Sequence, residues 1–235
     1  EDIQTLALPG VVPQVVDVSG DKAYIAGKNY SNALLVVELK SGEFYLTVVK
    51  QASIKDTHPS ADAFSLDVNN GVAYLTRHRL FTFGGYDSVG YLFRFDVSDP
   101  YSPDLRGDGV GQDYDYDELN LPKKIVVQGT TAYVADGAEL KVVDVSDLDN
   151  PVELGSWSAP DGSISSSYIC GIDNKKLYVV DGHGGVFLLD ITNPAQPILV
   201  GYVDTLIKTQ MGVINNGYAY VREWPYGSGT IIMLF

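Results

Sequence analysis

Acidic side chains crowd one segment of this sequence, residues 104–118, where they alternate with glycine and tyrosine. The segment holds six carboxylates, and a calcium ion takes six to eight oxygen ligands, often from a flexible loop. It is not an EF-hand, because the position eleven residues after Asp113 is Lys124, where a bidentate glutamate is required. Two interpretations stay open. One is a solvated acidic loop, and the other is a loosely bound calcium ion on Asp108, Asp113, Asp115 and Asp117. We expect no other cofactor.

Other residues that could do chemistry form weaker patterns. Two carboxylates could act as acid and base in glycoside hydrolysis, and Asp17 and Asp67 occupy equivalent places in two similar segments. A third such segment has Val126 at the equivalent place, which favours the interpretation of Asp17 and Asp67 as turn or strand-edge residues instead. No nucleophile motif surrounds a serine or Cys170. The histidines, which lack the spacing of metal ligands, are His58, His78 and His183.

Length and composition limit the class of protein. The chain has 235 residues, of which 45% are hydrophobic, so it can bury a substantial core. Its net charge of −14 offers no basic face for nucleic acid, and no apolar run approaches the length of a membrane span. Cys170 is the single cysteine, which excludes an intrachain disulfide.

A short element recurs five times along the chain. It consists of an apolar strand, a turn rich in Gly, Asn and Asp, and a second apolar strand centred on tyrosine. The central residues, 42 to 59 positions apart, are Tyr24, Tyr74, Tyr133, Tyr178 and Tyr220. Strand-forming repeats of about 40–50 residues predict propeller blades.

Two more strands follow each tyrosine in the best copies, so each repeat predicts four antiparallel strands. We therefore expect one all-β domain over residues 1–235, a five-bladed β-propeller. The predicted blades cover residues 11–50, 61–110, 121–158, 165–204 and 208–235, all approximately. Blade five ends after its third strand, and residues 3–8 resemble the fourth strands of other blades. We predict that residues 1–10 complete the last blade and close the ring, in the same chain or, less favoured, in a neighbouring one.

Two segments resemble LVIVD repeats. They are Lys-Val-Val-Asp-Val-Ser-Asp at 141–147 and Phe-Leu-Leu-Asp-Ile-Thr-Asn-Pro at 187–194, each preceded by a strand similar to Ala-Tyr-Val-Ala-Asp-Gly. That family forms β-propellers in surface and secreted proteins of bacteria and archaea. The resemblance thus implies a propeller at the cell surface or outside the cell. A chain that opens at Glu1, without Met, also fits a processed secreted protein.

The function expected from these features is a non-enzymatic one. We predict a secreted or cell-surface propeller that serves adhesion, assembly or display through contacts with a protein partner or with copies of itself. A carbohydrate-binding propeller that uses exposed Tyr and Trp is the alternative, followed by a glycoside hydrolase or lyase. The fold does not choose among them, because propellers host all three.

Overall fold

The computed structural model describes β-strands joined by tight turns. The residues that it describes are 12–28, 34–39, 46–52, 62–80, 88–107, 119, 121–159, 167–181, 185–204, 209–215, 218–223 and 230–234. Within these ranges all regular structure is strand, and none of them forms a helix able to span a membrane. The all-β prediction is confirmed for this part of the chain.

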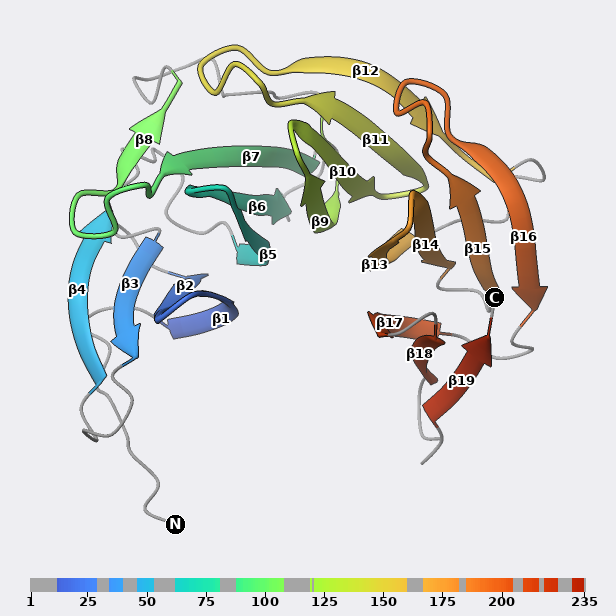
Figure 1. Ribbon diagram of the computed structural model, residues 1–235, viewed down its shortest axis with the longest axis horizontal. Helices are drawn as coiled ribbons and strands as arrows, with labels where there is room; N and C mark the ends of the chain where they lie inside the picture. Colours follow the sequence, from blue (N-terminus) through green and yellow to red (C-terminus); the bar gives the residue numbers. More distant parts are fainter. Residues whose placement is uncertain are drawn as a thin grey trace. The chain divides into compact units, whose positions relative to one another are not determined.

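The strands form five antiparallel sheets, each a meander of consecutive strands (Figure 1). The first contains β1 (Val12–Ser19), β2 (Lys22–Lys28), β3 (Leu34–Leu39) and β4 (Leu46–Ala52). The second contains β5 (Asp62–Asn69), β6 (Val72–Leu80), β7 (Ser88–Asp96) and β8 (Asp104–Arg106). The third contains β9 (Pro122–Gln128), β10 (Thr131–Asp136), β11 (Glu139–Asp144) and β12 (Val152–Trp157). The fourth contains β13 (Ser167–Asp173), β14 (Lys176–Asp181), β15 (Gly185–Asp190) and β16 (Ile198–Asp204). The fifth contains β17 (Thr209–Asn215), β18 (Tyr218–Glu223) and β19 (Thr230–Leu234).

Packing divides the chain into two compact units. The first unit holds residues 1–122 together with 147–151, and it contains the first two sheets. The second unit holds residues 123–146 and 152–235, with the other three sheets. Residues 1–10, expected to complete the fifth sheet, lie outside the described residues. Closure of a single ring therefore stays a prediction.

Turn residues with positive φ explain how the first two strands of a sheet reverse direction. Asn70 (φ 49°) and Gly71 (φ 76°) join β5 to β6, and Asn174 (φ 45°) and Lys175 (φ 61°) join β13 to β14. Two successive positive φ angles are typical of the type I′ turn, whose twist matches that of paired strands. The predicted turn chemistry is confirmed, although Lys175 occupies a position that glycine would adopt at lower cost.

An aspartate ends the third strand of three sheets and caps the turn that follows. Asp144 Oδ1 accepts a hydrogen bond from the backbone N–H of Ser146 at 2.8 Å. Asp190 Oδ1 accepts one from Thr192 at 2.9 Å, and Asp96 makes the corresponding bond at 3.0 Å. These Asx turns pair backbone donors that have left the strand ladder. The repeated acid is thus a structural part of the repeat.

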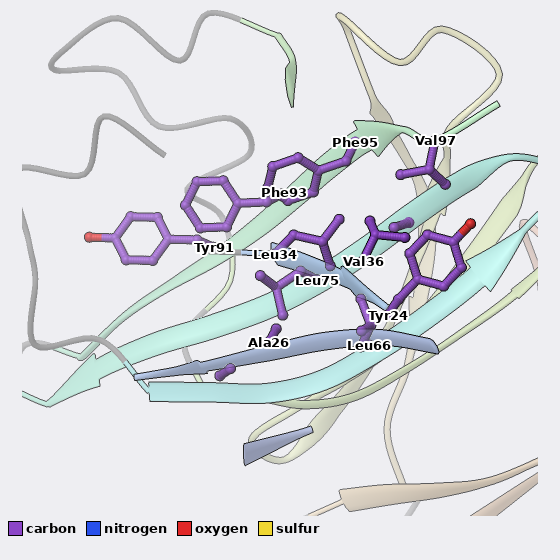
Figure 2. Packing of buried hydrophobic residues seen from close by; sticks show 12 residues of the cluster. Tyr24, Ala26, Leu34, Val36, Leu66, Leu75, Tyr91, Phe93, Phe95 and Val97 are labelled. Carbon is purple, nitrogen blue, oxygen red and sulfur yellow. The ribbon is translucent and has the colours of Figure 1, made fainter. Parts of the chain in front are cut away.

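The hydrophobic core lies between neighbouring sheets of each unit. Figure 2 shows the cluster between the first and second sheets, which includes Tyr24, Leu34, Val36, Leu66, Leu75, Phe93 and Phe95. In the second unit, Tyr133 and Tyr178 belong to similar clusters between successive sheets. Each large side chain that is fully buried contributes about 1.5–3 kcal/mol. The interpretation of the repeated tyrosines as packing residues between blades is confirmed for these positions.

Two side chains of β1 connect the first sheet to the second. Asp17 Oδ2 accepts a hydrogen bond from the backbone N–H of Val68 at 2.7 Å, and Gln14 Nε2 donates one to Asp62 Oδ1 at 2.7 Å. Asp17 is one of the two carboxylates that could act in glycoside hydrolysis. Its hydrogen bond gives it a structural role, in agreement with the strand-edge interpretation.

Candidate functional site

The calcium hypothesis concerns four residues that the structure does not place. Asp108, Asp113, Asp115 and Asp117 lie outside the described residues. In the described ranges, no group of three or more His, Cys, Asp or Glu side chains could hold a metal ion. The calcium site therefore stays a prediction.

Arg106 at the end of β8 belongs to an Arg-Gly-Asp tripeptide, a sequence associated with adhesion. Its guanidinium binds the carboxylate of Asp149 in a fork, with Nε–Oδ1 at 3.2 Å and Nη2–Oδ2 at 2.8 Å. The backbone N–H of Gly107 donates to the same carboxylate at 2.9 Å. These bonds hold the pKa of Asp149 below its ordinary value, with the side-chain bond from Arg106 as the largest cause. Arg106 thus fixes the turn at 147–151 within the first unit.

Exposed apolar side chains occur in rows on the outer strands of the third and fourth sheets. On β16, Ile198, Val200 and Tyr202 are 62%, 50% and 51% exposed. Val152 and Leu154 on β12 are exposed as well. Along each strand these residues alternate with less exposed ones, as the pleat of a strand requires. We call these five residues the rim patch. Apolar side chains exposed in rows, rather than singly, indicate a contact surface.

Three aromatic rings connect the rim patch to the core of the second unit. The ring centroid of Phe187 on β15 lies 5.4 Å from that of Trp157, and the two rings meet edge to face. The centroid of Phe187 lies 4.7 Å from that of Tyr202, and these two rings are tilted against each other. Such offset arrangements are the favourable ones for aromatic pairs. Gly185 makes room for the row, because a Cβ atom there would stand 2.5 Å from Cε2 of Tyr202. The row runs from the buried Phe187 to the half-exposed Tyr202.

A glycine in each outer strand reveals how differently the two strands are covered. At Gly155 in β12, a Cβ atom would clash with the carbonyl oxygen of Ala195 and stand 3.2 Å from its carbonyl carbon. The turn before β16 therefore rests directly on β12. Gly201 occupies the same place in β16, where the nearest described atom is Cβ of Leu188, at 3.5 Å in the same sheet. Within the described chain, no turn from another sheet covers β16 at this point.

Charged side chains near the rim patch are paired. Lys141 Nζ lies 3.0 Å from Glu153, the residue between Val152 and Leu154. Burial lowers the pKa of Lys141, but the hydrogen bond and charge of Glu153 outweigh it, so this pKa is raised. Asp190, the ladder partner of Ile198, accepts a 2.6 Å hydrogen bond from Lys176.

The pairing of Asp190 also shifts its titration. The side-chain hydrogen bond from Lys176 is the main cause that holds the pKa of Asp190 far below its ordinary value, and the bonds from Thr192 add to it. Asp190 therefore stays ionised at lower pH than an ordinary aspartate does. Lys176 neutralises the charge of Asp190, which would otherwise stand unpaired opposite the apolar Ile198.

A second group of side chains occupies equivalent positions in three sheets. Three residues after the repeated tyrosine, the second strand carries Arg77, Asp136 or Asp181, and all three are buried. Each of them interacts with other groups, as buried charges must if the fold is to tolerate them. Alignment of the repeats on their tyrosines would have identified this position from sequence. These residues are therefore buried charged side chains on the second strands of three sheets.

Sequence reasoning located the outer strands but did not identify their exposed faces. The fourth strands that the repeat predicts for the blades at 121–158 and 165–204 are confirmed, and they are β12 and β16. The available signal was the run Ile198-Leu199-Val200, whose apolar residues occupy both faces of the strand. That pattern is typical of a strand buried on both sides, yet repeat order places this strand at the edge of its sheet.

Comparison with known sequences identifies the repeat. The LVIVD repeat family matches residues 122–158 and 174–205. The first match coincides with the third sheet, and the second covers β14 to β16 of the fourth. The resemblance expected for these two segments is therefore confirmed. No curated protein matches the sequence.

Solved structures of propeller-like proteins share the fold. A functionally unknown protein from Desulfotomaculum acetoxidans is 12% identical over 94% of this chain and 64% of its own, with a TM-score of 0.62. A candidate 6-phosphogluconolactonase from Bacteroides uniformis is 16% identical over 90% and 63%, with a TM-score of 0.60. A hypothetical selenium-binding protein from Sulfolobus tokodaii is 16% identical over 91% and 58%, with a TM-score of 0.58. This chain spans less than two thirds of each of these proteins, and at such identities the likeness concerns the fold alone.

Proposed function

We propose that this chain, which carries LVIVD repeats in its third and fourth sheets, is a secreted or cell-surface β-propeller that binds proteins. In this proposal it serves adhesion, assembly or display and carries out no catalysis of its own. The location is supported by the resemblance to LVIVD proteins. The mode of action is supported by the rim patch.

The rim patch is the observation that carries this function. Five apolar side chains are exposed on two outer strands of a protein whose net charge is −14. Full burial of one such side chain contributes about 1.5–3 kcal/mol. Covering five partly exposed ones would therefore supply on the order of 5 kcal/mol before the entropic cost of association. A protein partner offers the continuous apolar surface that such covering requires.

We propose further that the five sheets close into one ring. Within each unit, the repeated tyrosine of one sheet shares a core cluster with the residue six positions before the tyrosine of the next, as Tyr178 does with Ile214. By this rule Tyr220 should pack against Val18. Tyr220 is only half-buried, unlike the other four repeated tyrosines, and Val18 is 57% exposed. The half-buried side chain of Tyr220 on the fifth sheet and the exposed side chain of Val18 on the first occupy the positions that pack together in the other pairs of sheets within each unit, which supports closure. In the closed ring, residues 1–10 would form the last strand of the fifth sheet.

A binding experiment with matched variants tests the protein-binding function. Wild-type protein is immobilised and exposed to the surface and secreted proteins of the organism that makes it, and each captured protein is purified and its Kd measured. Val200→Lys should weaken binding at least tenfold. Val12→Lys is the control, because Val12 is also exposed, at 65%, but lies on the first strand of the first sheet. Equal losses in both variants, or no loss in either, would contradict the proposal.

Carbohydrate binding is the second candidate, and the aromatic row favours it. Tyr202 is half-exposed beside Phe187 and Trp157, and exposed aromatic rings can stack on the apolar faces of sugars. A glycan array separates the two functions. Binding of a defined glycan that is lost in Tyr202→Ser and kept in Val152→Ser would establish carbohydrate binding.

A further inference from the structure

The turn that follows the third strand of a sheet rests on the sheet before it at three places in the described chain. Each of these turns begins at the aspartate that ends the third strand, namely Asp96, Asp144 or Asp190. In each case the contact is made by the fifth residue after that aspartate. We call these the docking residues, and they are Tyr101, Asp149 and Ala195.

Asp149 docks on the second sheet through charged hydrogen bonds. Its carboxylate accepts both arms of the Arg106 guanidinium, at 3.2 and 2.8 Å, and the backbone N–H of Gly107 at 2.9 Å. The buried Arg94 adds a bond from Nε to the carbonyl oxygen of Leu148 at 2.6 Å. A guanidinium fork matches the two oxygens of a carboxylate better than it matches a neutral side chain. The second sheet is thus suited to an acidic turn.

Tyr101 docks on the first sheet through different partners. Its hydroxyl donates a hydrogen bond to Glu38 Oε1 at 2.9 Å, and Lys22 Nζ lies 5.7 Å from the centre of its ring. A cation at this distance from an aromatic face is attracted by it. A carboxylate in place of the tyrosine would offer no proton to Glu38 and would repel it. The first sheet is therefore suited to a turn that carries a hydroxyl group on an aromatic ring.

Ala195 docks on the third sheet through its backbone. A Cβ atom on Gly155 would clash with the carbonyl oxygen of Ala195 and stand 3.6 Å from its Cα atom. So close an approach of two backbones requires glycine in the strand. A long side chain at position 155 would push the turn away from β12. The third sheet is therefore suited to a turn that lies directly on its backbone.

Arg106 and Gly155 occupy the same place in their sheets. Each lies on the fourth strand, in the ladder row that contains the repeated tyrosine. The row in the second sheet is Tyr74, Arg94 and Arg106, and the row in the third sheet is Tyr133, Val142 and Gly155. One position of the repeat thus carries a long cationic side chain in one sheet and no side chain in the next. In both sheets this residue suits the docking residue of the turn that rests on it.

From these observations we infer that the docking residue and the residue that receives it form a matched pair, which selects the turn that each sheet accepts. The pairs are Tyr101 with Glu38, Asp149 with Arg106, and Ala195 with Gly155. Because the repeats resemble one another, a turn could otherwise dock on the wrong sheet while the chain folds. Each pair favours its own turn over the others. This inference concerns the order of the sheets and does not depend on what the protein binds.

Exchange of the charges of Arg106 and Asp149 tests one pair in the full chain. Arg106→Asp and Asp149→Arg should each lower Tm, because like charges then face each other. The double variant keeps the net charge of −14 and should melt above both single variants. If net charge alone mattered, Asp149→Arg would raise Tm, since it reduces the repulsion within an acidic chain. That result, or a double variant that does not melt above both single variants, would overturn the inference.

Transfer of a pair to another sheet tests selection itself. Gly155→Arg should lower Tm, because the arginine meets the backbone of Ala195. Adding Ala195→Asp recreates the pair of the second sheet and should recover part of that loss. Ala195→Asn is the matched control in the same background, since it has nearly the same shape without the charge and should recover less.

The two transferred variants give a clear outcome. Greater recovery of Tm with aspartate than with asparagine supports selection by matched pairs. Equal recovery with both, or none with either, would show that the contacts are only local packing and would overturn the inference. If Gly155→Arg does not fold on its own, a cooperative melting transition that returns with aspartate and not with asparagine is the same supporting result.

Discussion

The two equivalent glycines of the outer strands provide a sharp test of how the sheets pack. Gly155 and Gly201 occupy the same place in the third and fourth sheets, but their surroundings differ. Alanine at position 155 would drive a methyl group into the carbonyl of Ala195, which belongs to the backbone of a turn. Alanine at position 201 would meet Leu188 at 3.5 Å, an ordinary van der Waals contact.

These distances predict that the two substitutions change the free energy of folding in opposite directions. Forcing an extra methyl group into a packed site costs about 1–3 kcal/mol. Replacing glycine in a strand by alanine gains about 0.5–1 kcal/mol, since the unfolded chain has fewer conformations to lose. Gly155→Ala should therefore lose about 1–2 kcal/mol of folding free energy, whereas Gly201→Ala should gain up to about 1 kcal/mol.

Thermal melting checks both values. For a chain of this size 1 kcal/mol shifts Tm by about 2–4 °C, so Gly155→Ala should lower Tm by about 2–8 °C. Gly201→Ala should raise it by up to about 4 °C. Shifts of the same sign in the two variants would refute the reasoning, because the packing of the turn on β12 is the sole difference invoked.

Three further predictions concern charge, metal and closure. Because the folded pKa of Asp190 is depressed, its contribution to stability is present above about pH 4 and lost as the pH falls below it. Asp190→Asn should lower the urea midpoint at pH 7 and flatten its decline between pH 4 and 2. Millimolar calcium should raise Tm if the segment 104–118 binds the ion, and an unchanged Tm identifies a solvated loop. If residues 1–10 complete the fifth sheet, deletion of residues 1–8 should lower Tm or cause aggregation, detectable by light scattering, because the edge of β19 would lose its partner strand; a soluble variant with unchanged Tm would contradict closure by this segment.

Much of the fold follows from local sequence patterns. The repeated tyrosines locate the second strand of each sheet, because a tyrosine amid alternating apolar residues suits a strand packed between two sheets. Asn70-Gly71 predicts its turn directly, since both residues tolerate positive φ. The acids that end the third strands, such as Asp144, mark turns for the same kind of local reason.

The candidate site depends on arrangements that local patterns do not encode. Whether Val200 is buried or exposed is decided by what lies on the far side of β16, not by its neighbours in sequence. Gly155 and Gly201 occupy the same position in their repeats, yet among the described residues a turn covers only the first. The fork between Arg106 and Asp149 joins residues 43 positions apart, which no motif predicts.

The meander of each sheet has a consequence for synthesis on the ribosome. Since every strand pairs with the one made just before it, a sheet can assemble within some 40–50 residues of emerging chain, with little loop-closure entropy. The bond between Asp17 and the backbone of Val68 can form as soon as the fifth strand appears. Each finished sheet then offers a surface on which the next sheet can pack, so we expect folding to advance in the direction of translation.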